Sequence, residues 1–121
     1  MKKDSDNIIL VKTKSFAIKI IKIYQYLTTE KKEFVLSKQL LRSGTSIGAN
    51  AKEASRGQSR ADFVAKINIA LKEASESEYW LELLHETNYL FEEEFSSLQK
   101  ELSEIIRILM AISHKTAPRT I

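Results

Sequence analysis

The stretch of the chain that decides the fold runs from residue 36 to residue 85 and reads LSKQLLRSGTSIGANAKEASRGQSRADFVAKINIALKEASESEYWLELLH. Apolar and small residues recur in it every three or four positions, which is the spacing of one face of an α-helix. Gly57 divides the stretch into two helical patterns, because glycine commonly follows the last residue of a helix. Gly44 and Gly48 lie inside the first pattern, where each costs about 1 kcal/mol relative to alanine. We therefore expect a neighbouring helix to come too close for a side chain there.

The same periodicity predicts four helices, over residues 12–28, 37–56, 60–86 and 92–114. Ser37 is the expected N-cap of the second helix, and Ser59 with Asp62 forms a capping pattern before the third. The last helix has an apolar seam that is expected to start at Phe91. Short connections force consecutive helices to run antiparallel, so the predicted fold class is all-α, an up-down-up-down four-helix bundle.

Composition supports one helical domain over residues 1–121. The chain has 43% hydrophobic and 29% charged residues, three glycines and one proline, which is typical of helices rather than sheets. Cysteine is absent, which excludes disulfides and thiolate metal sites. No apolar run approaches the roughly 20 residues of a membrane helix, and none resembles the core of a signal peptide. These observations predict a cytoplasmic protein without a membrane segment.

Charge is distributed unevenly along the chain, whose net charge is +3. Residues 1–61 contain 13 Lys and Arg against 5 Asp and Glu, whereas residues 62–121 contain 6 against 11. This polarity favours either one basic face or head-to-tail stacking of copies. Solvated lysines are a common alternative, but several copies around an axis would add their fields and attract phosphates. The candidate nucleic-acid-binding residues are Lys12, Lys19, Lys22, Arg42, Arg56, Arg60 and Lys66.

Two patterns resemble enzyme motifs but lack their context. Residues 44–48 spell Gly-x-Ser-x-Gly, yet a nucleophile elbow needs a strand before the serine Ser46, and both flanks here are helical. Glu82 and His85 form one Glu-x-x-His pair, whereas a di-iron bundle needs two such pairs. We expect His85 to be a partly buried residue that hydrogen-bonds to a polar neighbour. No catalytic residue, metal ligand or cofactor is predicted.

Polar residues also form a stripe beside the small residues of the second helix, and this stripe can be interpreted in two ways. Ser43, Ser46, Asn50 and Glu53 recur every three or four positions. On the third helix, the corresponding polar residues are Glu73, Glu76 and Trp80. The stripes either hydrogen-bond to each other and to the last helix, for example through Arg107, or form a subunit or ligand surface. We expect the hydrogen-bonded arrangement, because polar groups at a core edge are usually satisfied within the protein.

The run from Gln39 to Ala54, followed by Ser59, Asp62-Phe63 and the segment 69–76, resembles the bacterial 23S ribosomal RNA intervening-sequence family. That family is related to the accessory variability determinant proteins of diversity-generating retroelements. The resemblance implies a homopentamer, an RNA or DNA ligand and a reverse transcriptase as a possible partner. It also identifies Arg42, Ser43, Ser46, Asn50 and Glu53 as the family's polar pattern, and it transfers no catalytic residue.

These observations together predict a non-enzymatic, homo-oligomeric bundle, pentameric by resemblance, that binds nucleic acid. The partners expected from the resemblance are other copies of the chain, RNA or DNA, and a reverse transcriptase or an rRNA intervening sequence. The alternative is a protein-binding scaffold whose charge asymmetry only orders its own subunits.

Overall fold

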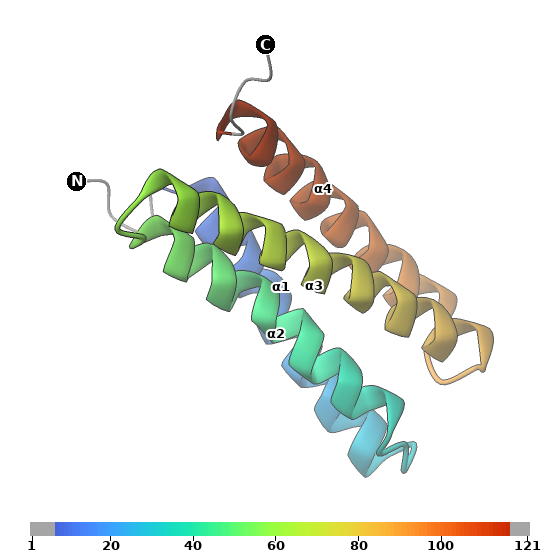
Figure 1. The fold of residues 1–121 in the computed structure, drawn as a ribbon. Coiled ribbons are helices and arrows are strands. Elements are labelled where there is room, and N and C mark those ends of the chain that lie inside the picture. Colours follow the sequence, from blue (N-terminus) through green and yellow to red (C-terminus); the bar gives the residue numbers. More distant parts are fainter. Residues whose placement is uncertain (1–6, 117–121) are drawn as a thin grey trace.

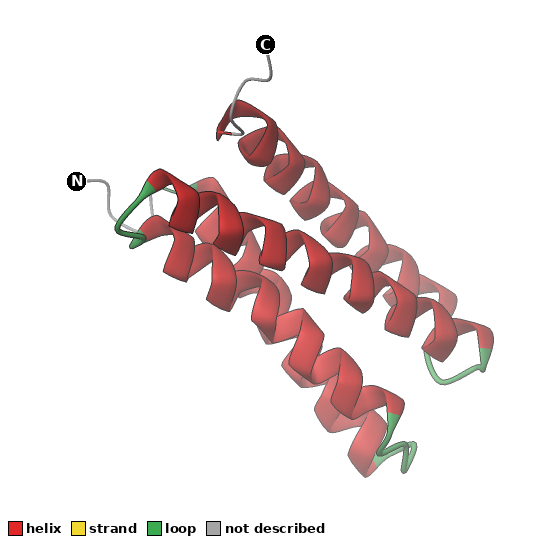
Figure 2. Ribbon diagram, viewed as in Figure 1, coloured by secondary structure: helices red, strands yellow, loops and turns green. Residues whose placement is uncertain are grey.

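The computed structural model describes residues 7–116, in which four helices are joined by short loops. They are α1 (Ile8–Thr29), α2 (Leu36–Ser55), α3 (Arg60–Glu86) and α4 (Glu92–Thr116). Consecutive helices run in opposite directions, and α1 also packs against α4, which closes an antiparallel bundle (Figure 1). The described residues contain helices and loops only (Figure 2). The predicted all-α four-helix arrangement is therefore confirmed.

Helix α1 begins earlier than the predicted start at residue 12. Asn7 is its N-cap, and the side-chain oxygen Oδ1 accepts a hydrogen bond from the backbone N–H of Ile9 at 3.2 Å. The next residues form the first turn, in which Ile9 and Leu10 are buried. The cap satisfies a backbone donor and the turn buries apolar surface. The helix therefore includes residues 8–11, which the prediction placed before it. The other helix bounds agree with the prediction to within two residues.

Glu33, and not Ser37, provides the cap at the start of α2. Its carboxylate accepts hydrogen bonds from the backbone N–H groups of Val35, Leu36 and Ser37, at 3.1, 3.0 and 2.7 Å. Ser37 is instead buried inside the helix, where its hydroxyl donates to the Glu33 carbonyl oxygen. A charged acceptor at a helix N-terminus forms stronger hydrogen bonds than a hydroxyl, which explains the correction. Burial raises the pKa of Glu33, but these hydrogen bonds outweigh it, and the pKa is lowered.

The ends of α3 follow known capping motifs. Ser59 Oγ accepts a hydrogen bond from the backbone N–H of Asp62 at 3.1 Å, as predicted. At the other end, Asn88 has a left-handed backbone with φ of 68°, and the N–H of Tyr89 donates to the carbonyl of Leu84 at 2.8 Å. This is a Schellman arrangement, which reverses the chain toward α4.

Phe91 corrects the predicted apolar seam of α4. It lies in the loop before the first turn of the helix and is 66% exposed. Leu90 is buried in its place, so the buried seam within α4 begins at Phe95. Helical spacing does not apply to a residue that precedes the helix, and this is why extending the pattern back to Phe91 was wrong.

Buried side chains from all four helices form one core. On α3, Ser77 occupies the core position between Ala74 and Leu81, and it is fully buried. The largest fully buried apolar side chains are those of Phe16, Ile20, Leu27, Leu40, Ile47, Ile67, Leu81, Leu84, Leu102, Ile105 and Leu109. None of the helices described between residues 7 and 116 is long and apolar enough to span a bilayer.

Helices α1 and α2 approach closely at the two glycines. A Cβ atom on Gly44 would lie 2.9 Å from Cγ2 and 3.0 Å from Cγ1 of the fully buried Ile20. A Cβ atom on Gly48 would lie 3.1 Å from Oγ1 of Thr13, whose hydroxyl donates to the carbonyl of Ile9. The expected reason for the glycines is thus confirmed, and the space is tighter at Gly44.

We predict that Gly44→Ala lowers the free energy of unfolding by about 1–3 kcal/mol, because overlap with Ile20 outweighs the gain in helix propensity of about 1 kcal/mol. Urea unfolding followed by circular dichroism measures the change. In an Ile20→Ala background, the same substitution should be neutral or stabilising, because the overlapping side chain is gone. An equal loss in both backgrounds would contradict the packing argument.

A second prediction concerns pH. Because the pKa of Glu33 is lower in the folded than in the unfolded protein, its stabilising effect is present above the unfolded pKa and disappears as the pH falls through the folded pKa. Glu33→Gln should cost about 1–2 kcal/mol at neutral pH, and the difference from the wild type should shrink as the pH falls. Urea midpoints between pH 7 and pH 3 test this, with the exposed Glu30→Gln as control. A difference that stays constant over this range would contradict it.

Candidate nucleic-acid interface

The seven predicted basic residues lie in three separate places. The first group, on α1, faces α4: Lys12 Nζ is 2.5 Å from Glu104 Oε1, and Lys19 Nζ is 2.6 Å from Glu101 Oε2. Lys22 is on the same helix, is exposed and has no acidic partner among residues 7–116. Two of these three cations therefore hold α1 against α4, which reduces the positive charge that they offer to a ligand.

Arg42 forms the second group and connects α2 to α3. Its guanidinium Nη1 is 3.2 Å from Glu73 Oε2, and its Nη2 contacts Glu76 Oε1. Trp80 Nε1 also donates to Glu76 Oε1, at 3.2 Å. The hydrogen bond from Arg42, assisted by Trp80, lowers the pKa of Glu76 against the opposing effect of burial. The prediction that Arg107 would bind the polar stripes is wrong, because α3 turns these carboxylates toward α2 and Arg42.

The polar stripe of α2 changes character along the helix. Ser43 is fully buried, and its Oγ accepts a hydrogen bond from the hydroxyl of the buried Ser77 at 2.9 Å. Ser46 and Asn50 donate to backbone carbonyls one turn earlier in α2, at 2.6 and 2.8 Å. The side chain of Glu53 is 60% exposed. The stripe is thus a buried contact at one end and a solvent-facing surface at the other.

The turn between α2 and α3 gathers the third group, and we call Lys52, Arg56, Arg60 and Lys66 the turn cluster. Three of them, all except Arg60, line an open groove of about 590 Å³ together with the carboxylates of Glu53 and Asp62 and with Gln58 and Ser59. Lys66 Nζ is 3.3 Å from Glu53 Oε1, at the edge of this groove. The turn therefore brings together three of the predicted basic residues and adds Lys52.

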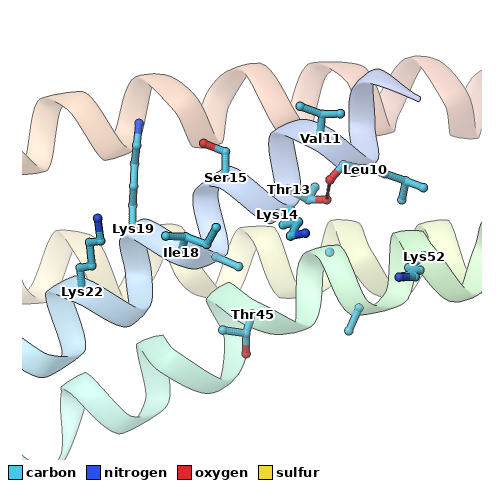
Figure 3. Close-up of a pocket in the computed structure, with 13 residues that line it drawn as sticks. Leu10, Val11, Thr13, Lys14, Ser15, Ile18, Lys19, Lys22, Thr45 and Lys52 are labelled. Atoms are coloured by element: carbon cyan, nitrogen blue, oxygen red, sulfur yellow. Dashed lines mark hydrogen bonds between the residues drawn. The ribbon is translucent and has the colours of Figure 1, made fainter. Parts of the chain in front are cut away.

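A second groove, of about 670 Å³, runs between α1 and α2, and we call it the α1–α2 groove. In Figure 3, Lys14 and Ile18 lie between the two helices, Lys52 stands on α2, and Lys19 rises toward α4. Sequence reasoning missed Lys14. It could have been found from its position, because it lies eight residues before Lys22 and therefore on nearly the same face of α1.

The patterns that resemble enzyme motifs have structural roles. Residues 44–48 are helical throughout, inside α2, so Ser46 is not on a strand-to-helix turn. His85 Nε2 is 2.6 Å from Glu92 Oε2, and the His85 ring stacks on Phe95 at 4.1 Å. This confirms the prediction of a partly buried histidine with a polar neighbour. Within residues 7–116, no three His, Asp or Glu side chains are grouped so that they could hold a metal ion.

The contact between Arg42 and Glu76 can be tested by fluorescence, because Trp80 is the only tryptophan. Arg42→Gln removes the hydrogen bond and the positive charge that keep the pKa of Glu76 low. We predict that the acid midpoint of Trp80 emission shifts to higher pH in this variant, while circular dichroism shows that the helices remain. Arg107→Gln is the control and should leave the midpoint unchanged. Identical midpoints for Arg42→Gln and the wild type would contradict the contact.

Comparison with known proteins agrees with the fold. A solved structure that is similar to this chain is a protein of unknown function from the S23 ribosomal protein family of Bacteroides thetaiotaomicron, with 53% sequence identity and a TM-score of 0.86. The match covers 87% of this chain and 97% of the other. No curated protein matches. Residues 5–111 match the sequence profile of the 23S rRNA-intervening sequence proteins, and the chain therefore belongs to the 23S rRNA-intervening sequence protein family.

Proposed function

We propose that the protein is a non-enzymatic homo-oligomer that binds nucleic acid through the turn cluster. The observation that carries this proposal is the grouping of Lys52, Arg56 and Lys66 around one open groove, with Arg60 next to it. Arg and Lys side chains at a turn contact phosphates without reading the base sequence. RNA is the favoured ligand, because the family is defined by intervening sequences of 23S rRNA.

The charge at the two ends of the bundle supports this position for the ligand. The α2–α3 turn lies at the same end as the C-terminal end of α4 (Figure 1), whose last turn contains His114 and Lys115. The opposite end contains Glu92, Glu93 and Glu94 in the first turn of α4. If several bundles stand side by side in the same orientation, their basic ends form one rim and their fields add. A pentamer, which the family resemblance implies, would have five turn clusters on that rim.

The absence of a nucleophile elbow at Ser46 supports a non-enzymatic role. The resemblance to accessory variability determinant proteins adds a reverse transcriptase as a second proposed partner. That partner would meet the nucleic acid on the same basic rim.

Filter binding of a structured RNA tests the nucleic-acid part of the proposal. The wild type should retain the RNA at 50 mM salt and lose it at higher salt, because released counterions drive the binding. Arg56→Ala combined with Arg60→Ala should weaken binding about tenfold or more and lower the salt slope by about 2. Lys100→Ala, an exposed lysine on α4, is the matched control and should bind like the wild type.

Failure of the wild type to retain RNA at low salt would overturn nucleic-acid binding and favour the alternative, a protein scaffold. One observation favours that alternative. Among the predicted cations, Lys12, Lys19, Arg42 and Lys66 already contact carboxylates of the same chain. Such a scaffold is expected to form an oligomer that does not bind RNA.

A further inference from the structure

The α1–α2 groove combines exposed apolar residues with lysines. Val11 and Ile18 line it and are 47% and 46% exposed, and Ile21, one helical turn beyond Ile18, is 40% exposed. The groove is lined by lysines of both helices and by no aspartate or glutamate. Two of these lysines, Lys14 and Lys22, have no carboxylate partner among residues 7–116. A branched apolar surface with basic edges suits an acidic protein surface better than a phosphate backbone.

A stripe of like charges lies on α3, and we call Glu78, Glu82 and Glu86 the acidic stripe. These residues are four apart, so they follow one face of the helix, and none has a cationic partner in the described part of the chain. Like charges at this spacing weaken a helix by a few tenths of a kcal/mol per pair. Tyr79, which is 55% exposed, lies next to the stripe. The stripe therefore costs the folded chain a little stability, and no ion pair within residues 7–116 offsets that cost.

The groove lies between α1 and α2, whereas the stripe lies on α3. Each helix packs against two neighbours in the order α1, α2, α3, α4, and the described residues show no packing between α1 and α3 or between α2 and α4. Lys14 and Lys22 are eight residues apart, as are Glu78 and Glu86. At about 1.5 Å per residue, both pairs span about 12 Å along their helices. Gly44 packs on Ile20 and Ser43 is hydrogen-bonded to Ser77, which places Lys22 nearly level with Glu78. Both charge pairs therefore meet when one copy is shifted along its helix axes relative to the other.

We propose that the α1–α2 groove binds the acidic stripe of a second copy of the chain. This inference rests on the self-association in the proposed function and names its interface. Ile18 and Tyr79 are the central apolar contacts, and the lysines and glutamates pair at the edges. The contact joins two different surfaces, so a pair of copies retains one free groove and one free stripe, and the series forms a ring where the rotation between successive copies closes it. Arg56 and Arg60, which the proposed function assigns to nucleic acid, lie outside this interface.

Charge reversal tests the interface by mass in solution, measured by light scattering at low salt. The groove variant, Lys14→Glu with Lys22→Glu, places carboxylates against those of the acidic stripe, and its mass should fall to that of the monomer. The stripe variant, Glu78→Lys with Glu86→Lys, places base against base, and its mass should also fall to that of the monomer. A chain that contains all four substitutions restores opposite charges at every contact and should regain the wild-type mass. Lys100→Glu is the control, and circular dichroism verifies that each variant is folded.

The outcomes separate this inference from the proposed function. If the wild type has the mass of an oligomer and the groove variant keeps that mass, the proposed interface is wrong, but self-association still stands. The interface is equally overturned if the chain with four substitutions stays monomeric. A monomeric wild type overturns both the interface and the proposed oligomer, whereas RNA retention, tested separately through Arg56 and Arg60, still decides nucleic-acid binding.

Discussion

The close contact of α1 with α2 at Gly44 is the constraint on which the rest of the structure depends. Ile20 occupies the space that a side chain at position 44 would need, so the two helices pack near their closest practical distance. The same run of small residues continues with Gly48 and Ala49, which leave the surface between the helices hollow and line the α1–α2 groove. One choice of small residues therefore sets both the packing of the core and the shape of an outer surface.

Charged residues divide into those that pair between helices and those that gather on the outer surface. Lys12, Lys19 and Arg42 contact carboxylates of neighbouring helices and are part of the fold. The turn cluster gathers at one end of the bundle, whereas Lys14 and Lys22 of the groove and the acidic stripe lie along its length. The charges that are distributed unevenly between the two halves of the chain are thus arranged on three distinct surfaces of the folded protein. Their positions allow one surface to contact nucleic acid while the other two contact copies of the chain.

Sequence periodicity predicted the helices well, because each helix has a regular apolar face. Capping was predicted correctly at Ser59, where donor and acceptor are three residues apart. It was wrong at Ser37, because Glu33 folds back from the loop and binds the amides of Val35, Leu36 and Ser37, along a path that has no sequence signature. The role of His85 was predicted, whereas the cation facing the polar stripes was not. The identity of that cation depends on which helices become neighbours and on how each helix is rotated about its own axis.

The sequence by itself determined the number and order of the helices, their buried faces and the need for a close contact at the glycines. These features follow from interactions within one or two helical turns, which a linear pattern records. Only the tertiary structure decided which charges pair between helices and where the basic side chains gather. Arg42 and Glu73 are 31 residues apart and Lys19 and Glu101 are 82 apart, so their meeting depends on the packing of whole helices.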